Sequence, residues 1–287
     1  MAQTLLNFAQ DFLAQGAVKV LEKSKPVLSE IPVLNIQGNA YSYNILNTLP
    51  DVNMRTYDEN IDSVQVLPDK KTVDLKIMSA STKVDRAHEL VAGNINSVKA
   101  IELEASMENM GQTLMEQFFY GDGTGNNMTG LVEYVKAGIG KAFDGEITGD
   151  PATVDAEMTM IDEALNFVKD CRTETSFIAV SPATAIKLNR LFRNANIALT
   201  SKEAFSRSLK AYDGVAILTD EAVKDGELWI VRVGENYTSL VTNAGFKVYD
   251  RGLVGVHYIT DCEGLFNVVV KQPRAVAVIR KSATKSK

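Results

Sequence analysis

The sequence predicts an α+β fold, in which strands and helices fall into separate runs of the chain. Three observations predict it. Residues 53–85 alternate apolar and polar side chains, as the strands of a β-hairpin do. Residues 86–120 repeat apolar side chains at intervals of three and four, as a long helix does. After a glycine-rich loop, helical and strand patterns are mixed over the rest of the chain.

The composition indicates a globular protein of one large domain or two ordinary ones. The chain has 287 residues, of which 45% are hydrophobic and 23% charged. A net charge of -6 argues against a stand-alone nucleic-acid binder, although a protein that merely encloses nucleic acid can be acidic. Cys171 and Cys262 lack the spacing of a metal site, so we expect ordinary reduced thiols. Signal-peptide features and long apolar runs are absent, so we expect a soluble protein with no membrane partner.

The first part of the chain has the character of an arm. Residues 1–24 contain an amphipathic helical pattern, which ends at Lys25-Pro26. This helix packs either on its own core or on a neighbouring subunit. Ile31–Arg55 is extended and interrupted by prolines and a glycine, so we expect an ordered arm running over other elements.

The hairpin in residues 53–85 is the clearest strand signal. Its alternating apolar positions are Val64, Val66, Val73, Leu75 and Ile77. Between its two arms we expect a charged turn formed by Pro68, Asp69, Lys70 and Lys71. A two-stranded ribbon of this length is marginal alone in water, so it must lie on its own domain or on another chain.

The helical pattern from Arg86 to Tyr120 predicts a helix roughly 50 Å long at ~1.5 Å per residue. Asp85 is its expected N-cap. Gly93 and Gly111 interrupt the pattern and no heptad is sustained, so a helix that crosses a flat subunit fits better than a coiled coil.

The rest of the chain mixes helices and short buried strands. We expect helices over 153–169 and from Ser181-Pro182 onward, and strands at 177–180, 215–218, 228–233, 257–260, 265–271 and 274–280.

The loop in FFYGDGTGNNMTGL, residues 118–131, resembles a ligand site only loosely. A phosphate cradle needs a helix N-terminus, whereas this loop follows the end of a helix. Asp122, Thr124, Asn126 and Glu133 have calcium-loop spacing, but the sharp-turn position lacks glycine. We therefore expect a structural turn, in which Gly121 ends the helix, Asp122 follows it, and both Gly121 and Gly125 take conformations that a side chain would forbid.

Catalytic constellations are missing from the sequence. The two histidines, His88 and His257, stand in no nucleophile or zinc pattern, and no G-x-S-x-G or H-E-x-x-H occurs. We expect no enzyme activity, no catalytic residues, no metal and no cofactor.

Several short stretches, taken in order, resemble one family. They are IQGNAYSYN and TLPDVNMR near the start, STKVDR before the long helix, FFYGDG at its end with MTGL beyond, and the closing QPRAVAVI. In this order they resemble the major capsid protein of tailed bacteriophages, whose fold is shared by encapsulin shells. Each stretch is weak alone, and the resemblance covers most of the chain.

The resemblance implies four parts. These are an N-terminal arm at 1–33, an extended loop hairpin at 54–85, an axial domain at 132–255, and a peripheral domain with the long helix as its spine. The peripheral domain would comprise 34–53, 86–131 and 256–287, with QPRAVAVI as its last strand.

The resemblance also implies a function. The chain would self-assemble into hexamers and pentamers of an icosahedral head shell that encloses double-stranded DNA, with weak and non-specific DNA contact. Partners would be copies of itself, a portal, and scaffolding or decoration proteins, in a virion assembled in the host cytoplasm. The alternatives are an encapsulin-like compartment with a protein cargo, or a metal- or nucleotide-binding α/β enzyme that uses the loop at 121–130.

Two departures from the family bear on the expected contacts. Some relatives carry a long N-terminal scaffolding segment, whereas only a short arm precedes IQGNAY here. Some relatives crosslink a lysine of the extended loop to a neighbour's asparagine. We expect Pro68, Asp69, Lys70 and Lys71 to contact a neighbouring subunit, although the sequence shows no carboxylate partner for a crosslink.

Overall fold

The computed structural model describes residues 25, 27–45, 54, 56–57, 69–88, 95–172, 175–204 and 207–281. The helix expected in residues 1–24, the first hairpin arm with Pro68, and the stretch 89–94 of the long helix lie outside these ranges.

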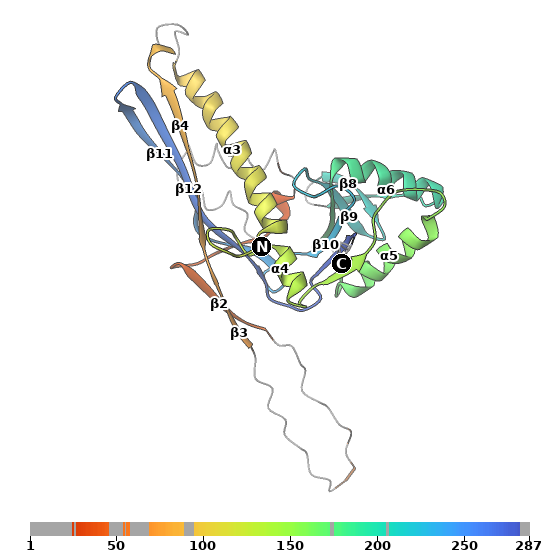
Figure 1. The fold of residues 1–287 in the computed structure, drawn as a ribbon. Helices are drawn as coiled ribbons and strands as arrows, with labels where there is room; N and C mark the ends of the chain where they lie inside the picture. Colours follow the sequence, from red (N-terminus) through yellow and green to blue (C-terminus); the bar gives the residue numbers. More distant parts are fainter. Residues whose placement is uncertain are drawn as a thin grey trace, which may run out of the picture.

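The described residues form two sheets, a two-stranded ribbon and four α-helices (Figure 1). The long sheet has the order β1 (Val33–Asn35), β11 (Thr238–Val254), β12 (His257–Val270), β4 (Lys76–Asp85). The compact sheet has the order β5 (Lys141–Asp144), β13 (Val276–Arg280), β10 (Leu228–Arg232), β6 (Ser176–Val180), β9 (Val215–Thr219), β8 (Arg207–Tyr212), β7 (Thr200–Ala204). The ribbon consists of β2 (Ala40–Ile45) and β3 (Asp69–Asp74). The α-helices are α3 (Ile95–Tyr120), α4 (Leu131–Lys136), α5 (Val154–Phe167) and α6 (Pro182–Asn194), and a short 3-10 helix, η2 (Leu28–Glu30), precedes β1.

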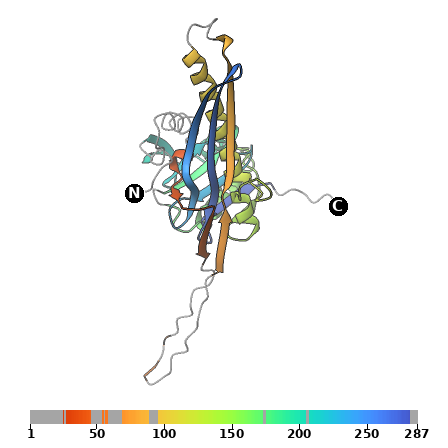
Figure 2. The same cartoon turned by 90° about the vertical axis from the view of Figure 1, so that its left-hand side faces the viewer.

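The long sheet is built on the β11–β12 hairpin. A two-residue turn joins these strands, and its first residue, Gly255, has a φ of 66°, which glycine adopts without strain. β12 pairs antiparallel with β4 along the whole of β4. α3 lies lengthwise against one face of this sheet, and its far end reaches the compact sheet (Figures 1 and 2).

The compact sheet buries both faces because its central strands alternate between two cores. In β6, Phe177 and Ala179 join the core shared with the end of α3, while Ile178 and Val180 join the core under α5 and α6. α6 begins as predicted, since the Ser181 Oγ accepts a hydrogen bond from the Thr184 N–H at 3.0 Å.

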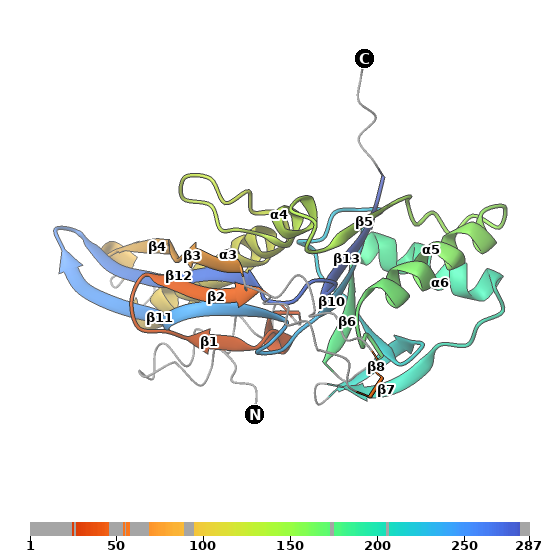
Figure 3. The ribbon, with the colours of Figure 1, turned by 90° about the horizontal axis from the view of Figure 1, so that it is seen from below.

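The ribbon packs on the face of the long sheet opposite α3 (Figure 3). A small core holds it there, formed by Tyr43 and Ile45 of the ribbon, Leu75 at its end, and Val241 and Val269 of the sheet. The ribbon base is therefore anchored by its own apolar face.

Two sequence expectations about strands are wrong. Asp69, Lys70 and Lys71 are not a turn, because they lie in β3 and pair with β2 in the register Tyr43↔Lys71. The two segments expected at 257–260 and 265–271 are one continuous strand, β12. The last part of the expected axial range, residues 238–254, forms β11, which lies in the long sheet.

The closing strand also differs from expectation. The resemblance placed QPRAVAVI in the peripheral domain, but β13 lies in the compact sheet between β5 and β10. Its burial explains this position, because Val276 and Val278 face one core of the sheet while Ala277 and Ile279 face the other.

Candidate assembly site at the base of the ribbon

Two glycines let the end of α3 pass against the start of α4. The Gly121 N–H donates to the Gln117 carbonyl at 2.9 Å, and the Gly130 N–H donates to the Gly121 carbonyl at 2.9 Å. A Cβ on Gly121 would lie 2.2 Å from the Met128 carbonyl oxygen, and one on Gly130 would lie 2.4 Å from the Gly121 nitrogen. Close approach of two backbones therefore requires both glycines.

The loop between these glycines is held by Asp122. One carboxylate oxygen accepts from the Thr124 N–H at 3.0 Å and the Asn127 side-chain amide at 2.9 Å, and the other accepts from the Thr124 hydroxyl at 2.8 Å. These hydrogen bonds, that from Asn127 foremost, lower the pKa of Asp122 to about 2. Gly125 has a φ of 56°, as the turn prediction requires.

The calcium hypothesis needs these same oxygens. The Asp122 carboxylate is occupied by donors of its own loop, and Glu133 forms an ion pair with Lys136 at 2.6 Å. Among the described residues, no group of three or more His, Cys, Asp or Glu is placed to hold a metal ion.

Pairing in the ribbon sorts its side chains onto two faces. Residues directly opposite on an antiparallel ladder point to the same side, and neighbours along a strand point to opposite sides. Lys71 is opposite Tyr43, whose side chain is buried against the long sheet, so Lys71 lies on the inner face. Lys70 is opposite Asn44 and lies on the outer face.

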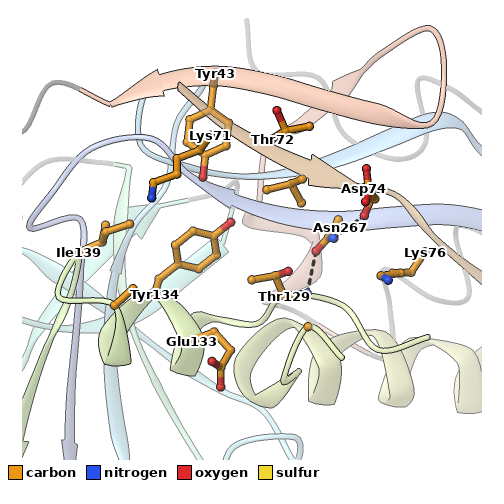
Figure 4. Close-up of a pocket in the computed structure, with 13 residues that line it drawn as sticks. Tyr43, Lys71, Thr72, Asp74, Lys76, Thr129, Glu133, Tyr134, Ile139 and Asn267 are labelled. Atoms are coloured by element: carbon orange, nitrogen blue, oxygen red, sulfur yellow. Dashed lines mark hydrogen bonds between the residues drawn. The ribbon is translucent and has the colours of Figure 1, made fainter. Parts of the chain in front are cut away.

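A pocket of about 430 Å³ lies between the ribbon's inner face and α4 with the loop before it (Figure 4). Tyr43 and Lys71 line it from the ribbon, and Glu133 and Tyr134 from α4. The Tyr134 hydroxyl donates to the Val268 carbonyl at 2.8 Å. Burial raises the pKa of both tyrosines above the ordinary value of 10.0, so both stay neutral near pH 7.

The structure brings the ribbon base and the glycine loop together. The Lys76 Nζ, one residue beyond Leu75 at the start of β4, donates to the Gly125 carbonyl at 2.7 Å. Gly121, Asp122 and Gly125 lie in one loop, as predicted, whereas Asp69, Lys70 and Lys71 lie in the ribbon strand β3. That these ribbon residues contact a neighbouring subunit stays a prediction, and Pro68 lies outside the described ranges.

Sequence reasoning missed two residues of this site, Asn267 and Gly130. Asn267 was visible as a single amide within the apolar run LFNVVV, and Gly130 as the second glycine of FFYGDGTGNNMTGL. Asn267 is 1% exposed and faces the pocket (Figure 4).

The two cysteines and His257 lie in surroundings that give them no chemical role. Cys171 and Cys262 are free and buried, and burial raises the pKa of each thiol to about 11, which keeps the thiols protonated and unreactive. His257 lies 4.0 Å from the Asp85 carboxylate at the far end of the long sheet. Within the described ranges, no helix combines the length and apolar character needed to cross a membrane.

Comparison with known proteins agrees with this architecture. The family model described as Major capsid protein GP7 matches residues 12–141. No curated protein matches the chain by sequence. Among solved structures, the capsid of an empty GTA particle is 14% identical with a TM-score of 0.65, covering 91% of this chain and 90% of that one.

Two further structures show the same fold. The SrpI encapsulin of Synechococcus elongatus PCC 7942 is 16% identical with a TM-score of 0.63, covering 87% of this chain and 84% of that one. The procapsid of satellite phage P4, solved with its size determination (Sid) protein, is 12% identical with a TM-score of 0.57, covering 95% and 91%.

The fold is therefore the α+β fold of phage capsid proteins and encapsulins, and the predicted resemblance is confirmed. The family model described as Major capsid protein GP7 covers a little less than half of the chain and agrees with this fold.

Proposed function

We propose that copies of this chain close into hexamers and pentamers of an icosahedral head shell that encloses the double-stranded DNA of a tailed phage. The observation that carries this proposal is the fold. It extends over both sheets, the ribbon and α3, and it is shared with particle shells across 87–95% of the chain. The family match and the fold point to a structural role.

We assign a role in the shell to each of the four parts that the resemblance implies. The arm at 1–33 and the extended loop at 54–85 reach neighbouring subunits. The domain boundaries depart from the expected ones at two strands: the compact sheet, including β13, faces the capsomer axis, and the long sheet, including β11, carries α3 at the periphery. Support comes from the ribbon, whose inner residues Tyr43 and Ile45 are buried on the long sheet while the outer face is polar and exposed.

The outer face of the ribbon is the surface we assign to the neighbouring subunit. It presents Asn44, Lys70 and Thr72, and the Thr72 hydroxyl lies 2.9 Å from that of Ser42. A polar, hydrogen-bonding surface of this kind suits contacts that must form and re-form during assembly, since polar interfaces are typical of non-obligate association.

The remaining partners are also part of this proposal. A chain of net charge -6 makes only weak, sequence-independent contact with packaged DNA, because strong phosphate neutralisation needs clustered cations. A portal and scaffolding or decoration proteins complete the head in the host cytoplasm, and the mature protein resides in the virion.

Particle content tests the proposal. Particles purified after expression of the phage genome segment are treated with nuclease, and their interior is then analysed for nucleic acid and protein. Nuclease-protected double-stranded DNA is the expected result. Particles that exclude DNA and contain one enzyme in fixed ratio would contradict it.

That second result would support the alternative, an encapsulin-like compartment. The observation that favours it is the likeness to the SrpI encapsulin, which has a TM-score of 0.63. Deleting the genes next to this one separates the two functions, since loss of a cargo enzyme leaves an encapsulin-like shell intact but empty.

A further inference from the structure

The ribbon leaves the long sheet at one point. β4 pairs with β12 as far as Lys76↔Phe266. One residue earlier, Leu75 is buried and its N–H donates to the Asn39 carbonyl at 2.8 Å, so the strand has already turned toward β2. Beyond this point β3 can no longer use backbone groups of β12, and its carbonyls there need other donors.

The Asn267 side chain supplies that donor. Its Nδ2 donates to the Asp74 carbonyl at 2.6 Å. Its Oδ1 accepts from the Thr129 N–H at 2.9 Å and from its own neighbour, the Val268 N–H, at 2.8 Å. One buried amide thus joins β12, the glycine loop and the ribbon, three segments far apart in sequence (Figure 4).

Other contacts also hold the ribbon base. The bond from the Lys76 Nζ to the Gly125 carbonyl is exposed to water. The apolar core of Tyr43, Ile45 and Leu75 is on the sheet side, and on the α4 side the Tyr43 hydroxyl shares a hydrogen bond with that of Tyr134 beside the 430 Å³ pocket. The Asn267 contact differs from these because it holds the ribbon backbone itself, at the Asp74 carbonyl, where the ribbon leaves the sheet.

We propose that Asn267 is a positioning residue for assembly, which fixes the direction in which the ribbon leaves the body toward the neighbouring subunit. This inference rests on the proposed function, because direction matters only if the ribbon meets another copy.

The substitution Asn267→Asp tests this role with little change in size. The ionised carboxylate still accepts from the Thr129 and Val268 N–H groups, but an oxygen replaces the donor to the Asp74 carbonyl, so the contact with the ribbon becomes repulsive in addition to the general cost of a buried charge. Asn166→Asp is the matched control, an exposed asparagine beyond the compact sheet that accepts from Arg172. Should Asn267→Asp fail to fold, Asn267→Ser keeps a polar group that is too short to reach both Thr129 and Asp74.

The first measurement is hydrogen exchange of unassembled subunits by mass spectrometry. We expect exchange in β2, β3 and Leu75 to rise by about tenfold or more, the factor for one lost buried hydrogen bond, with α3 and α5 unchanged. A uniform rise over the whole chain would mean that Asn267 is merely structural, and no change at the ribbon would overturn the proposal.

The second measurement is the size distribution of particles by electron microscopy. Asn267→Asp should give irregular or open particles where the wild type and Asn166→Asp give uniform closed ones. Uniform closed shells from Asn267→Asp would refute the positioning role and leave the proposed function standing. Absence of shells from the wild type would refute the proposed function, while the exchange measurement would still report whether Asn267 directs the ribbon.

Discussion

Replacing Gly121 by alanine should destabilise the subunit far more than the same change at Gly125. A Cβ at Gly121 would lie 2.2 Å from the Met128 carbonyl oxygen and 2.7 Å from that of Gln117, against an ordinary contact of 3.4–4 Å. Both neighbours are backbone, so the two segments must separate by more than an ångström.

That separation has a cost that the structure allows us to work out. It breaks the hydrogen bonds from the Gly130 N–H to Gly121 and from the Gly123 N–H to Met128, each 2.9 Å long. Two lost bonds at ~1 kcal/mol each, with ~1–3 kcal/mol for overpacking, give a loss of about 3–5 kcal/mol in the free energy of unfolding. At Gly125 nothing lies within 4 Å of the Cβ, so only the left-handed φ of 56° is penalised, at ~1–2 kcal/mol.

Urea unfolding of unassembled subunits measures the difference. Trp229, the one tryptophan, is buried with its ring 5.6 Å from that of Phe119 near the end of α3, so its fluorescence reports this region. We expect Gly121→Ala to lower the unfolding free energy by about 1–4 kcal/mol more than Gly125→Ala does, which is the gap between the two sums above. Equal losses for the two variants would refute the role of close backbone approach.

Three other predictions concern the cap, the loop and the ribbon. Ser181→Ala removes the cap of α6 and should lower the free energy of unfolding by ~1 kcal/mol in thermal denaturation; an unchanged melting temperature would contradict this. The Asp122 pKa of about 2 lies below its ordinary 3.8, so its contribution to stability is present above pH 4 and is lost as pH falls toward 2. The wild type should therefore have a higher free energy of unfolding than Asp122→Asn at neutral pH, and the two values should be equal near pH 2. A difference in unfolding free energy that persists near pH 2 would contradict the role given to the hydrogen bonds of the Asp122 carboxylate. Lys70→Glu, on the outer face, should lower shell yield about tenfold, the effect of ~1.4 kcal/mol per contact, without altering subunit unfolding. Lys71→Glu, on the inner face, should instead lower subunit stability, and the reverse pattern would contradict the assignment of faces.

Local patterns predicted the elements that local chemistry determines. The end of the long helix at Tyr120, the helix over α5, and the serine cap with proline at the start of α6 were all readable, because caps and apolar spacing act within a few residues. The buried strand β6 was also predicted, because its apolar residues face cores on both sides of the sheet.

Strand partners were the part that the sequence could not provide. Asp69, Lys70 and Lys71 have turn composition, yet the alternation of Tyr41 and Tyr43 across from them decides that they form a strand. β12 appeared interrupted at Asp261–Gly264, but pairing with both β11 and β4 carries the strand through these polar residues.

The site showed the same limit. Gly121 was predicted as a helix end, which is correct, but the requirement for glycine arises from contact with Met128 and Gly130 across the loop rather than from a left-handed φ. Asn267 acts through residues 138 and 193 positions away in the chain, so no local pattern marks its role.

Negative-stain electron microscopy of the protein, expressed alone and with its neighbouring genes, tests the central claim most directly. A shell-forming subunit should give closed polyhedral particles, or rings of five and six subunits. A uniform monomer or dimer under both conditions would contradict the account.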